Sequence, residues 1–123
     1  MARYPGLTLR ILADKHPAMG PGKARLVAAI DATGSISAAA RSMGMSYRRA
    51  WQLVDALNES FSHPVVLTAT GGKRGGGARV TAFGRGLIRR YRAMEDKASA
   101  AIVKDVRLFT RHLKRQPAAR GTR

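Results

Sequence analysis

The sequence lacks cysteine, contains few acidic residues and has no long apolar run. The absence of cysteine excludes disulfide bonds and thiolate metal sites. A helix that crosses a bilayer needs about 20 consecutive apolar residues, and no segment supplies them. Residues 1–12 contain no continuous apolar core, so they do not fit a signal peptide. We therefore expect a cytoplasmic protein with no membrane partner.

Positive charge dominates the chain. Its 123 residues include 23 Lys and Arg but only 7 Asp and Glu, which gives a formal net charge of +16. Self-repulsion on this scale destabilises a folded chain, and a polyanionic partner relieves it. Nucleic acid is the expected partner, with an anionic membrane surface or an RNA-rich particle as alternatives. The apolar content of 45% is that of a folded domain with one core.

The N-terminal part reads as a strand, a loop and a helix. Alternating apolar residues predict a short strand over residues 7–12, and the glycines and prolines of residues 13–22 predict a loop. Residues 1–20 thus form an N-terminal strand and loop that precede the main domain. The first helix is predicted over Pro21–Thr33, because proline suits a first turn and Gly34 a helix end.

Two further helices are joined by a short turn. Ser35 or Ser37 caps a short alanine-rich helix that ends near Met43. A three-residue turn, residues 44–46, then leads to a helix over residues 47–61 that is capped by Ser46. Two helices joined by a short glycine-containing turn are typical of the helix-turn-helix motif.

A β-hairpin and a long helix complete the predicted fold. The pattern predicts strands over residues 65–70 and 78–81, joined by the glycine-rich tip 71–77. Together they form a β-hairpin with the shape of a wing. Residues 21–81 therefore predict a winged helix-turn-helix domain, mainly α with a small β-hairpin. A long dimerisation helix is expected over residues 82–115, and a basic, disordered tail over residues 116–123.

The long helix carries an apolar stripe with steps of three and four residues, close to a heptad pattern. A domain of this size cannot cover the whole apolar stripe of the long helix. We therefore expect the helix to pair with that of a second copy. The predicted homodimer interface comprises Leu87, Tyr91, Met94, Ala98, Ile102, Val106 and Phe109, and the stripe continues to Leu113.

The predicted DNA-reading residues lie at the start of the third helix. Helical periodicity gathers Arg48, Arg49 and Gln52 on its polar side, and these residue types hydrogen-bond guanine and adenine edges. An ordinary solvated helix is the alternative. Hydroxyls at helix N-termini also suit DNA phosphates, although simple capping explains them equally well. The predicted interface on the helices comprises Ser35, Ser37, Ser46, Tyr47, Arg48, Arg49 and Gln52.

The hairpin adds basic residues to this predicted surface. Lys73, Arg74 and Arg79 lie among glycines, which let a loop approach a phosphate backbone or a narrow minor groove. A mobile surface hairpin without a ligand is the alternative. The glycine-rich tip does not follow the G-x-x-x-x-G-K-[ST] order of a nucleotide-binding loop.

No catalytic arrangement is evident in the sequence. His16, His63 and His112 show no metal-ligand spacing, and no G-x-S-x-G elbow occurs. We expect the adjacent Glu95 and Asp96 to be solvated charges on the long helix. We therefore expect no enzyme activity, no cofactor, no metal and no small-molecule site.

Several short blocks follow one another in a set order along the chain. The blocks are Ala29-Ile30-Asp31, Thr33-Gly34-Ser35-Ile36-Ser37, Ala39-Ala40, Gly44-Met45-Ser46-Tyr47, Ala50-Trp51, Val54-Asp55, Leu57-Asn58, Thr70-Gly71-Gly72-Lys73, Gly75-Gly76-Gly77-Ala78, and Thr81 with Gly84. This order resembles the N-terminal domain of the molybdate-responsive transcriptional regulator ModE family and, more distantly, that of LysR-type regulators. The resemblance covers roughly residues 20–95 and does not include the β-barrel domains that bind molybdate in that family. It implies a winged helix-turn-helix dimer on a palindromic operator, with residues 47–61 as the recognition helix.

Three functions are compatible with the motifs and the charge. The first is a sequence-specific, dimeric regulator that binds double-stranded DNA. The second is an architectural, nucleoid-type protein that coats DNA with little sequence preference. The third is an RNA- or ribosome-associated factor, which only the charge supports.

Overall fold

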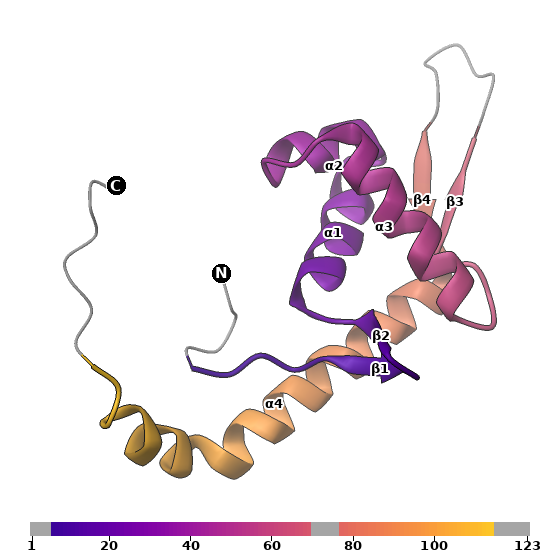
Figure 1. Cartoon of the computed structure of the whole chain (residues 1–123). Coiled ribbons are helices and arrows are strands. Elements are labelled where there is room, and N and C mark those ends of the chain that lie inside the picture. The colour runs from indigo at the N-terminus through magenta and orange to yellow at the C-terminus, as the bar shows by residue number, and fades with distance from the viewer. Residues whose placement is uncertain (1–5, 70–76, 115–123) are drawn as a thin grey trace.

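The computed structural model describes residues 6–69 and 77–114, and it contains four helices and two small antiparallel sheets in these ranges (Figure 1). The predicted fold class is confirmed, because a three-helix domain with a wing is followed by one long helix. The elements are β1 (Ile11–Ala13), β2 (His16–Met19), α1 (Pro21–Thr33), α2 (Ile36–Ser42), α3 (Tyr47–Ser60), β3 (Val66–Thr68), β4 (Ala78–Val80) and α4 (Ala82–Thr110).

Local side-chain caps and glycines set the limits of the helix-turn-helix. The Ser35 hydroxyl accepts a hydrogen bond from the Ala38 amide at 3.0 Å, and the Ser46 hydroxyl accepts one from the Arg49 amide at 3.0 Å. Gly44 turns the chain between α2 and α3 with a φ of 67°, a conformation that side chains with a Cβ rarely adopt. These caps confirm the predicted starts of both helices within one residue.

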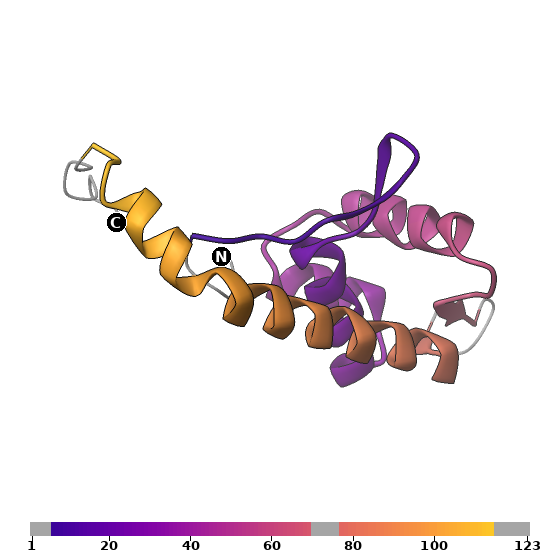
Figure 2. The same cartoon turned by 90° about the horizontal axis from the view of Figure 1, so that it is seen from below.

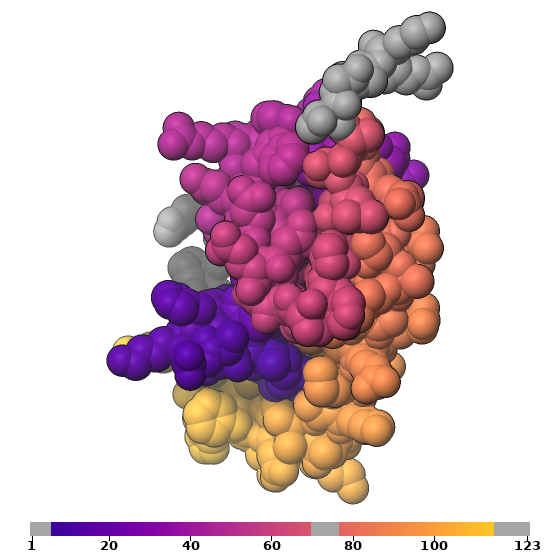
Figure 3. Space-filling model, turned by 90° about the vertical axis from the view of Figure 1, so that its right-hand side faces the viewer, coloured from indigo at the N-terminus to yellow at the C-terminus, as the bar shows by residue number. Residues whose placement is uncertain are grey.

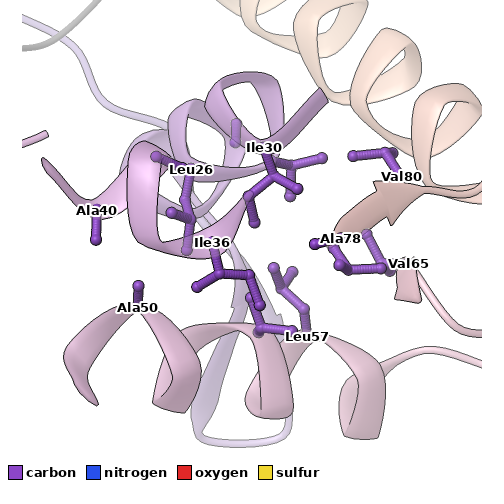
Figure 4. Packing of buried hydrophobic residues seen from close by; sticks show 14 of the residues in the cluster. Leu26, Ile30, Ile36, Ala40, Ala50, Leu57, Val65, Ala78 and Val80 are labelled. Carbon is purple, nitrogen blue, oxygen red and sulfur yellow. The ribbon is translucent and has the colours of Figure 1, made fainter. Parts of the chain in front are cut away.

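The core lies where the three helices and the wing meet, and Figure 4 shows their apolar side chains pointing toward one another. Leu26 and Ile30 of α1 face Leu57 of α3, and Val65 and Val80 close the side next to the wing. Small residues at the crossing of α2 and α3, Ala40 and Ala50, let the two helices approach closely.

Strands β3 and β4 form the wing, with Val66 opposite Val80 and Thr68 opposite Ala78. The wing is joined to the helices at two places. The Ala78 amide donates to the carbonyl oxygen of Gly34 at the end of α1, and Asn58 of α3 bonds to the start of β3. The predicted tip lies outside the described residues, except for Gly77.

Helix α4 begins at a compact junction and then extends past the domain. The Thr81 hydroxyl caps it by accepting from the Gly84 amide at 2.9 Å, and donates to the carbonyl oxygen of Pro64 at 2.7 Å. Gly84 packs so tightly against Val65 that a Cβ on this residue would lie 2.6 Å from the Val65 carbonyl oxygen. The helix ends at Thr110, before the predicted end at residue 115, and Figure 2 shows its last turns projecting away from α1–α3.

The N-terminal region differs from the prediction of one strand followed by a loop. Strands β1 and β2 form a hairpin around Asp14, whose φ of 55° is an unusual conformation that aspartate tolerates. The predicted strand lies too early in the chain, because the alternation of residues 7–12 gives no indication of the turn at Asp14. The segment before β1 runs along α4 in both cartoon views (Figures 1 and 2), with Gly6 beside Val106.

Candidate nucleic-acid interface

Helix α3 presents one polar side and buries the other. Ala50, Val54 and Leu57 have 1% exposure or less, whereas Arg48 and Gln52 lie exposed on the opposite side. Arg49 is exposed at the edge between the two sides. The helical period therefore separates the core residues from the predicted DNA-reading residues, as the spacing predicts.

The first turn of α3 adds aromatic and hydroxyl groups to this surface. The Tyr47 side chain is 54% exposed and meets the ring of Trp51 edge to face, with 6.2 Å between the ring centroids. Ser46 is exposed and already accepts the capping bond, so its capping role is confirmed. Phosphate contact by Ser46 and Tyr47 stays a prediction.

The two serines near the start of α2 differ in their surroundings. Ser35 is half-buried and caps the helix, which confirms the capping interpretation for it. Ser37 is exposed, and its hydroxyl accepts a hydrogen bond from Arg41 at 3.4 Å. Both hydroxyls lie at a helix start, where free backbone amides favour an anion.

The described part of the wing contains one of the three basic residues that are predicted to contact DNA. Arg79 is exposed on β4, between the buried side chains of Ala78 and Val80. It therefore points to the outer face of the wing, as strand alternation requires. Lys73 and Arg74 lie outside the described residues.

A basic pocket beside α3 was not predicted from the sequence. It lies between the N-terminal hairpin, the start of α1 and the outer side of α3, and its lining includes Arg10, Lys23 and Arg49. None of the residues that line it is acidic. Burial, and next the positive charge of Arg49, lower the pKa of Lys23.

This pocket borders the side of α3 that is predicted to read DNA. In the space-filling view α3 lies exposed in the centre of the face, with the indigo N-terminal hairpin directly below it (Figure 3). Lys23 also donates to the carbonyl oxygen of Pro17 at 2.6 Å, which holds its ammonium group beside the hairpin. Sequence reasoning missed the pocket because its three cations come from three separate segments.

The predicted dimer residues of α4 fall into three groups by exposure. Met94, Ile102 and Phe109 are 41%, 37% and 74% exposed, and Leu87, Ala98 and Val106 are half-buried. Tyr91 differs from the prediction, because it is only 1% exposed and its hydroxyl donates to the carbonyl oxygen of Leu9 at 2.7 Å. The N-terminal segment therefore covers Tyr91 within the chain itself.

The prediction that Glu95 is a solvated charge of α4 is wrong, because the structure buries its carboxylate. Glu95 is 3% exposed and accepts a hydrogen bond from Arg92 at 3.0 Å, so it forms an ion pair within one helical turn. No group of histidine and acidic residues in the described ranges is arranged to hold a metal ion. Among the helices that the structure describes, none is long and apolar enough to cross a membrane.

Three helices, a two-stranded wing and an exposed polar side of α3 define a winged helix-turn-helix protein. Residues 22–85, which span α1 through the start of α4, match the bacterial regulatory helix-turn-helix protein family, lysR family. The chain belongs to this family.

Curated relatives include two proteins named after molybdenum and a transcriptional regulator. The chain is 47% identical to the molybdenum-pterin-binding protein MopB of Rhodobacter capsulatus, over 81% of this chain and 36% of that protein. It is 36% identical to the molybdenum transport protein ModE of Azotobacter vinelandii, over 72% of this chain and 33% of that protein. The DNA-binding transcriptional dual regulator ModE of Escherichia coli (strain K12) is 42% identical, over 58% of this chain and 27% of that protein.

The chain thus spans about a third of the length of the curated relatives it matches. Among solved structures, ArgP from Mycobacterium tuberculosis matches with a TM-score of 0.49 and 21% identity. That match covers 68% of this chain and 30% of ArgP.

Proposed function

We propose that this chain is a sequence-specific regulator that binds double-stranded DNA through α3 and the wing. The observation that carries the proposal is the exposed polar side of α3, where Arg48, Arg49 and Gln52 follow directly on the helix-turn-helix turn. Arginine and glutamine there match the donor and acceptor pattern of guanine and adenine in the major groove. The relative named as the DNA-binding transcriptional dual regulator ModE supports this function.

The active unit in this proposal is a homodimer on a palindromic operator. Helix α4 exposes Met94, Ile102, Leu108 and Phe109, and such a row of large apolar side chains in water favours association. Two copies related by a twofold axis present two recognition helices, which a palindrome matches. Replacing Met94 and Ile102 by Lys should convert a dimer into a monomer, as measured by light scattering.

Selection of bound sequences from random DNA duplexes tests the proposed function. We expect one preferred site, bound at least about 10³-fold more tightly than random DNA at about 150 mM salt. Arg48→Ala with Arg49→Ala should weaken binding to that site by about 1–3 kcal/mol per lost base contact and flatten the preference. Arg89→Ala, an exposed arginine on α4, is the matched control and should keep the preference.

An architectural DNA-coating protein is the second candidate, because the net charge of +16 supports binding to any phosphate backbone. It predicts a specificity ratio near one in the same competition experiment. Equal or tighter binding to structured RNA would instead favour an RNA-associated role. Either result would refute sequence-specific DNA recognition by α3.

A further inference from the structure

The basic pocket beside α3 has the chemistry of an anion-binding site. Arg10 comes from the segment before β1, Lys23 from the first turn of α1 and Arg49 from the edge of α3, and all three line the same space. Within the described ranges, none of these three cations forms an ion pair with a carboxylate. Positive groups gathered in this way, without a carboxylate partner, favour an anion between them.

The start of α1 adds backbone donors to the pocket. The N-cap Gly20 has no side chain to cap the helix, and Pro21 has no amide hydrogen to donate. The first bond of the helix runs from the Ala24 amide to the Gly20 carbonyl oxygen at 3.0 Å. The amides of Gly22 and Lys23 therefore have no acceptor within the helix, and both residues line the pocket. A Cβ on Gly22 would meet nothing within 4 Å, so the chain is open to a ligand at this residue.

Two contacts hold the cations near the start of α1. The Lys23 ammonium group donates to the carbonyl oxygen of Pro17 at 2.6 Å, which leaves two of its three donors for a ligand. The Arg10 side chain lies against the N-cap, because its Cγ atom is 3.4 Å from the place of a Cβ on Gly20. Side chains that are already held lose less conformational entropy on binding an anion than free surface side chains do.

The pocket has a volume of about 280 Å³. One water molecule occupies about 30 Å³ in the liquid, so a single phosphate group fits together with several waters. We propose that the pocket binds a backbone phosphate of the DNA duplex whose major groove receives α3. The inference rests on the DNA binding proposed above, and it extends the DNA-binding surface beyond α3 and the wing to the N-terminal hairpin.

The position of the pocket fits a phosphate of the same duplex. A major groove that admits a helix has a phosphate backbone along each side of that helix. In the space-filling view the N-terminal hairpin lies below α3, and the wing strands lie toward the top (Figure 3). Arg49 lines the pocket and also lies at the edge of the side of α3 that exposes Arg48 and Gln52. The wing thus meets one backbone of the duplex, and the pocket meets the other.

Neutral methylphosphonate groups, placed one at a time in the duplex that carries the preferred site, test the proposal with the full-length chain. At one phosphate beside the bases that α3 reads, the neutral group should weaken binding by the natural chain about tenfold, because a charge-assisted hydrogen bond is lost. In Lys23→Ala the same group should weaken binding less than about twofold, because that phosphate has already lost its partner.

Two further variants make the result specific to the pocket. Arg25→Ala is the matched control and should keep the tenfold loss, because Arg25 is an exposed residue of α1 that does not line the pocket. Arg10→Ala, at an exposed residue that does line it, should reduce the loss as Lys23→Ala does and leaves the bond between Lys23 and Pro17 in place. Equal losses in the natural chain, Lys23→Ala and Arg10→Ala at every phosphate would overturn the proposal.

Failure of the pocket contact and failure of the proposed function give different results. If selection yields no preferred site, sequence-specific binding fails, and the pocket is then tested on random duplexes. There Lys23→Ala should lower the slope of log K against log salt concentration by about 1, and an unchanged slope would overturn the pocket contact.

A free oxyanion is the other source of the same chemistry. If about 10 mM inorganic phosphate raised the unfolding temperature of the natural chain but not that of Lys23→Ala, the pocket would bind the free ion. Together with methylphosphonate losses that do not depend on Lys23, this result would overturn the DNA contact. We expect the opposite result, in which the methylphosphonate loss depends on Lys23 and inorganic phosphate has the same small effect on both proteins.

Discussion

The side chain of Asn58 donates a hydrogen bond to the carbonyl oxygen of Val66 at 2.9 Å and so joins the end of α3 to the first strand of the wing. Its carbonyl oxygen accepts from the amides of Val65 and Val66 at 2.8 and 3.2 Å. One amide group thus satisfies three backbone groups at buried residues. The two elements proposed to contact DNA are therefore held at a fixed angle by a residue that has no predicted role in binding.

Replacing Asn58 by Ala should lower the free energy of unfolding by about 2–3 kcal/mol. The loss arises because buried backbone groups of Val65 and Val66 are left without partners. Urea denaturation measures the change. Gln52→Ala, at an exposed position of the same helix, should stay within about 0.5 kcal/mol of the natural chain. Equal effects of the two variants would contradict the role assigned to Asn58.

Two glycines of α4 should respond oppositely to alanine. At Gly84 a Cβ would lie 2.6 Å from the Val65 carbonyl oxygen, so Gly84→Ala should destabilise the chain by about 1–3 kcal/mol. At Gly86 the nearest atom is the end of the Arg89 side chain at 3.6 Å. Gly86→Ala should therefore stabilise the helix by up to about 1 kcal/mol. Thermal denaturation of both variants gives the comparison, and a stable Gly84→Ala protein would rule out the close contact.

The basic pocket beside α3 should contribute a DNA phosphate contact. Lys23→Ala should weaken binding by a similar factor for all DNA sequences and reduce the slope of log K against log salt concentration by about 1. Arg25→Ala is the matched control, because Arg25 is exposed two residues further along α1 and does not line the pocket. A similar change of slope in both variants would indicate general charge attraction and no contact at the pocket.

The contact between Tyr91 and Leu9 should depend on pH. Burial, and next the negative charge of Glu95, raise the pKa of Tyr91 from 10.0 to about 12. Since the folded-state pKa is the higher one, the stabilisation is complete below pH 10 and is lost as the pH rises toward 12. Tyr91→Phe removes the hydroxyl and should cost about 1–2 kcal/mol at neutral pH.

The measurement for Tyr91 is the difference in unfolding free energy between the natural chain and Tyr91→Phe at several pH values. Taking the difference cancels the titration of the many lysines that both proteins share. We expect this difference to be constant up to about pH 10 and to shrink above it. If this difference in unfolding free energy does not change up to about pH 12, the stability that the Tyr91 hydroxyl contributes does not depend on its protonation.

The order of elements from α1 to α4 and the polar side of α3 were predictable because they depend on local rules. Serine caps at residues 35 and 46 and the positive φ of Gly34 and Gly44 act over a few residues, so their signals are visible in the sequence. The period of the helix alone places Arg48 and Gln52 opposite Val54. The DNA contact of Lys73 and Arg74 stays a prediction, because both residues lie outside the described ranges.

The sequence by itself therefore determined the winged helix-turn-helix and the polar side that α3 exposes, because capping, turns and periodicity are local. Only the tertiary structure decided that Tyr91 is covered by the segment around Leu9, 82 residues away in the chain. It also brought Arg10, Lys23 and Arg49 to one pocket. These contacts depend on where separate segments pack, and a hydrophobic stripe does not specify whether its own chain or a second copy covers it.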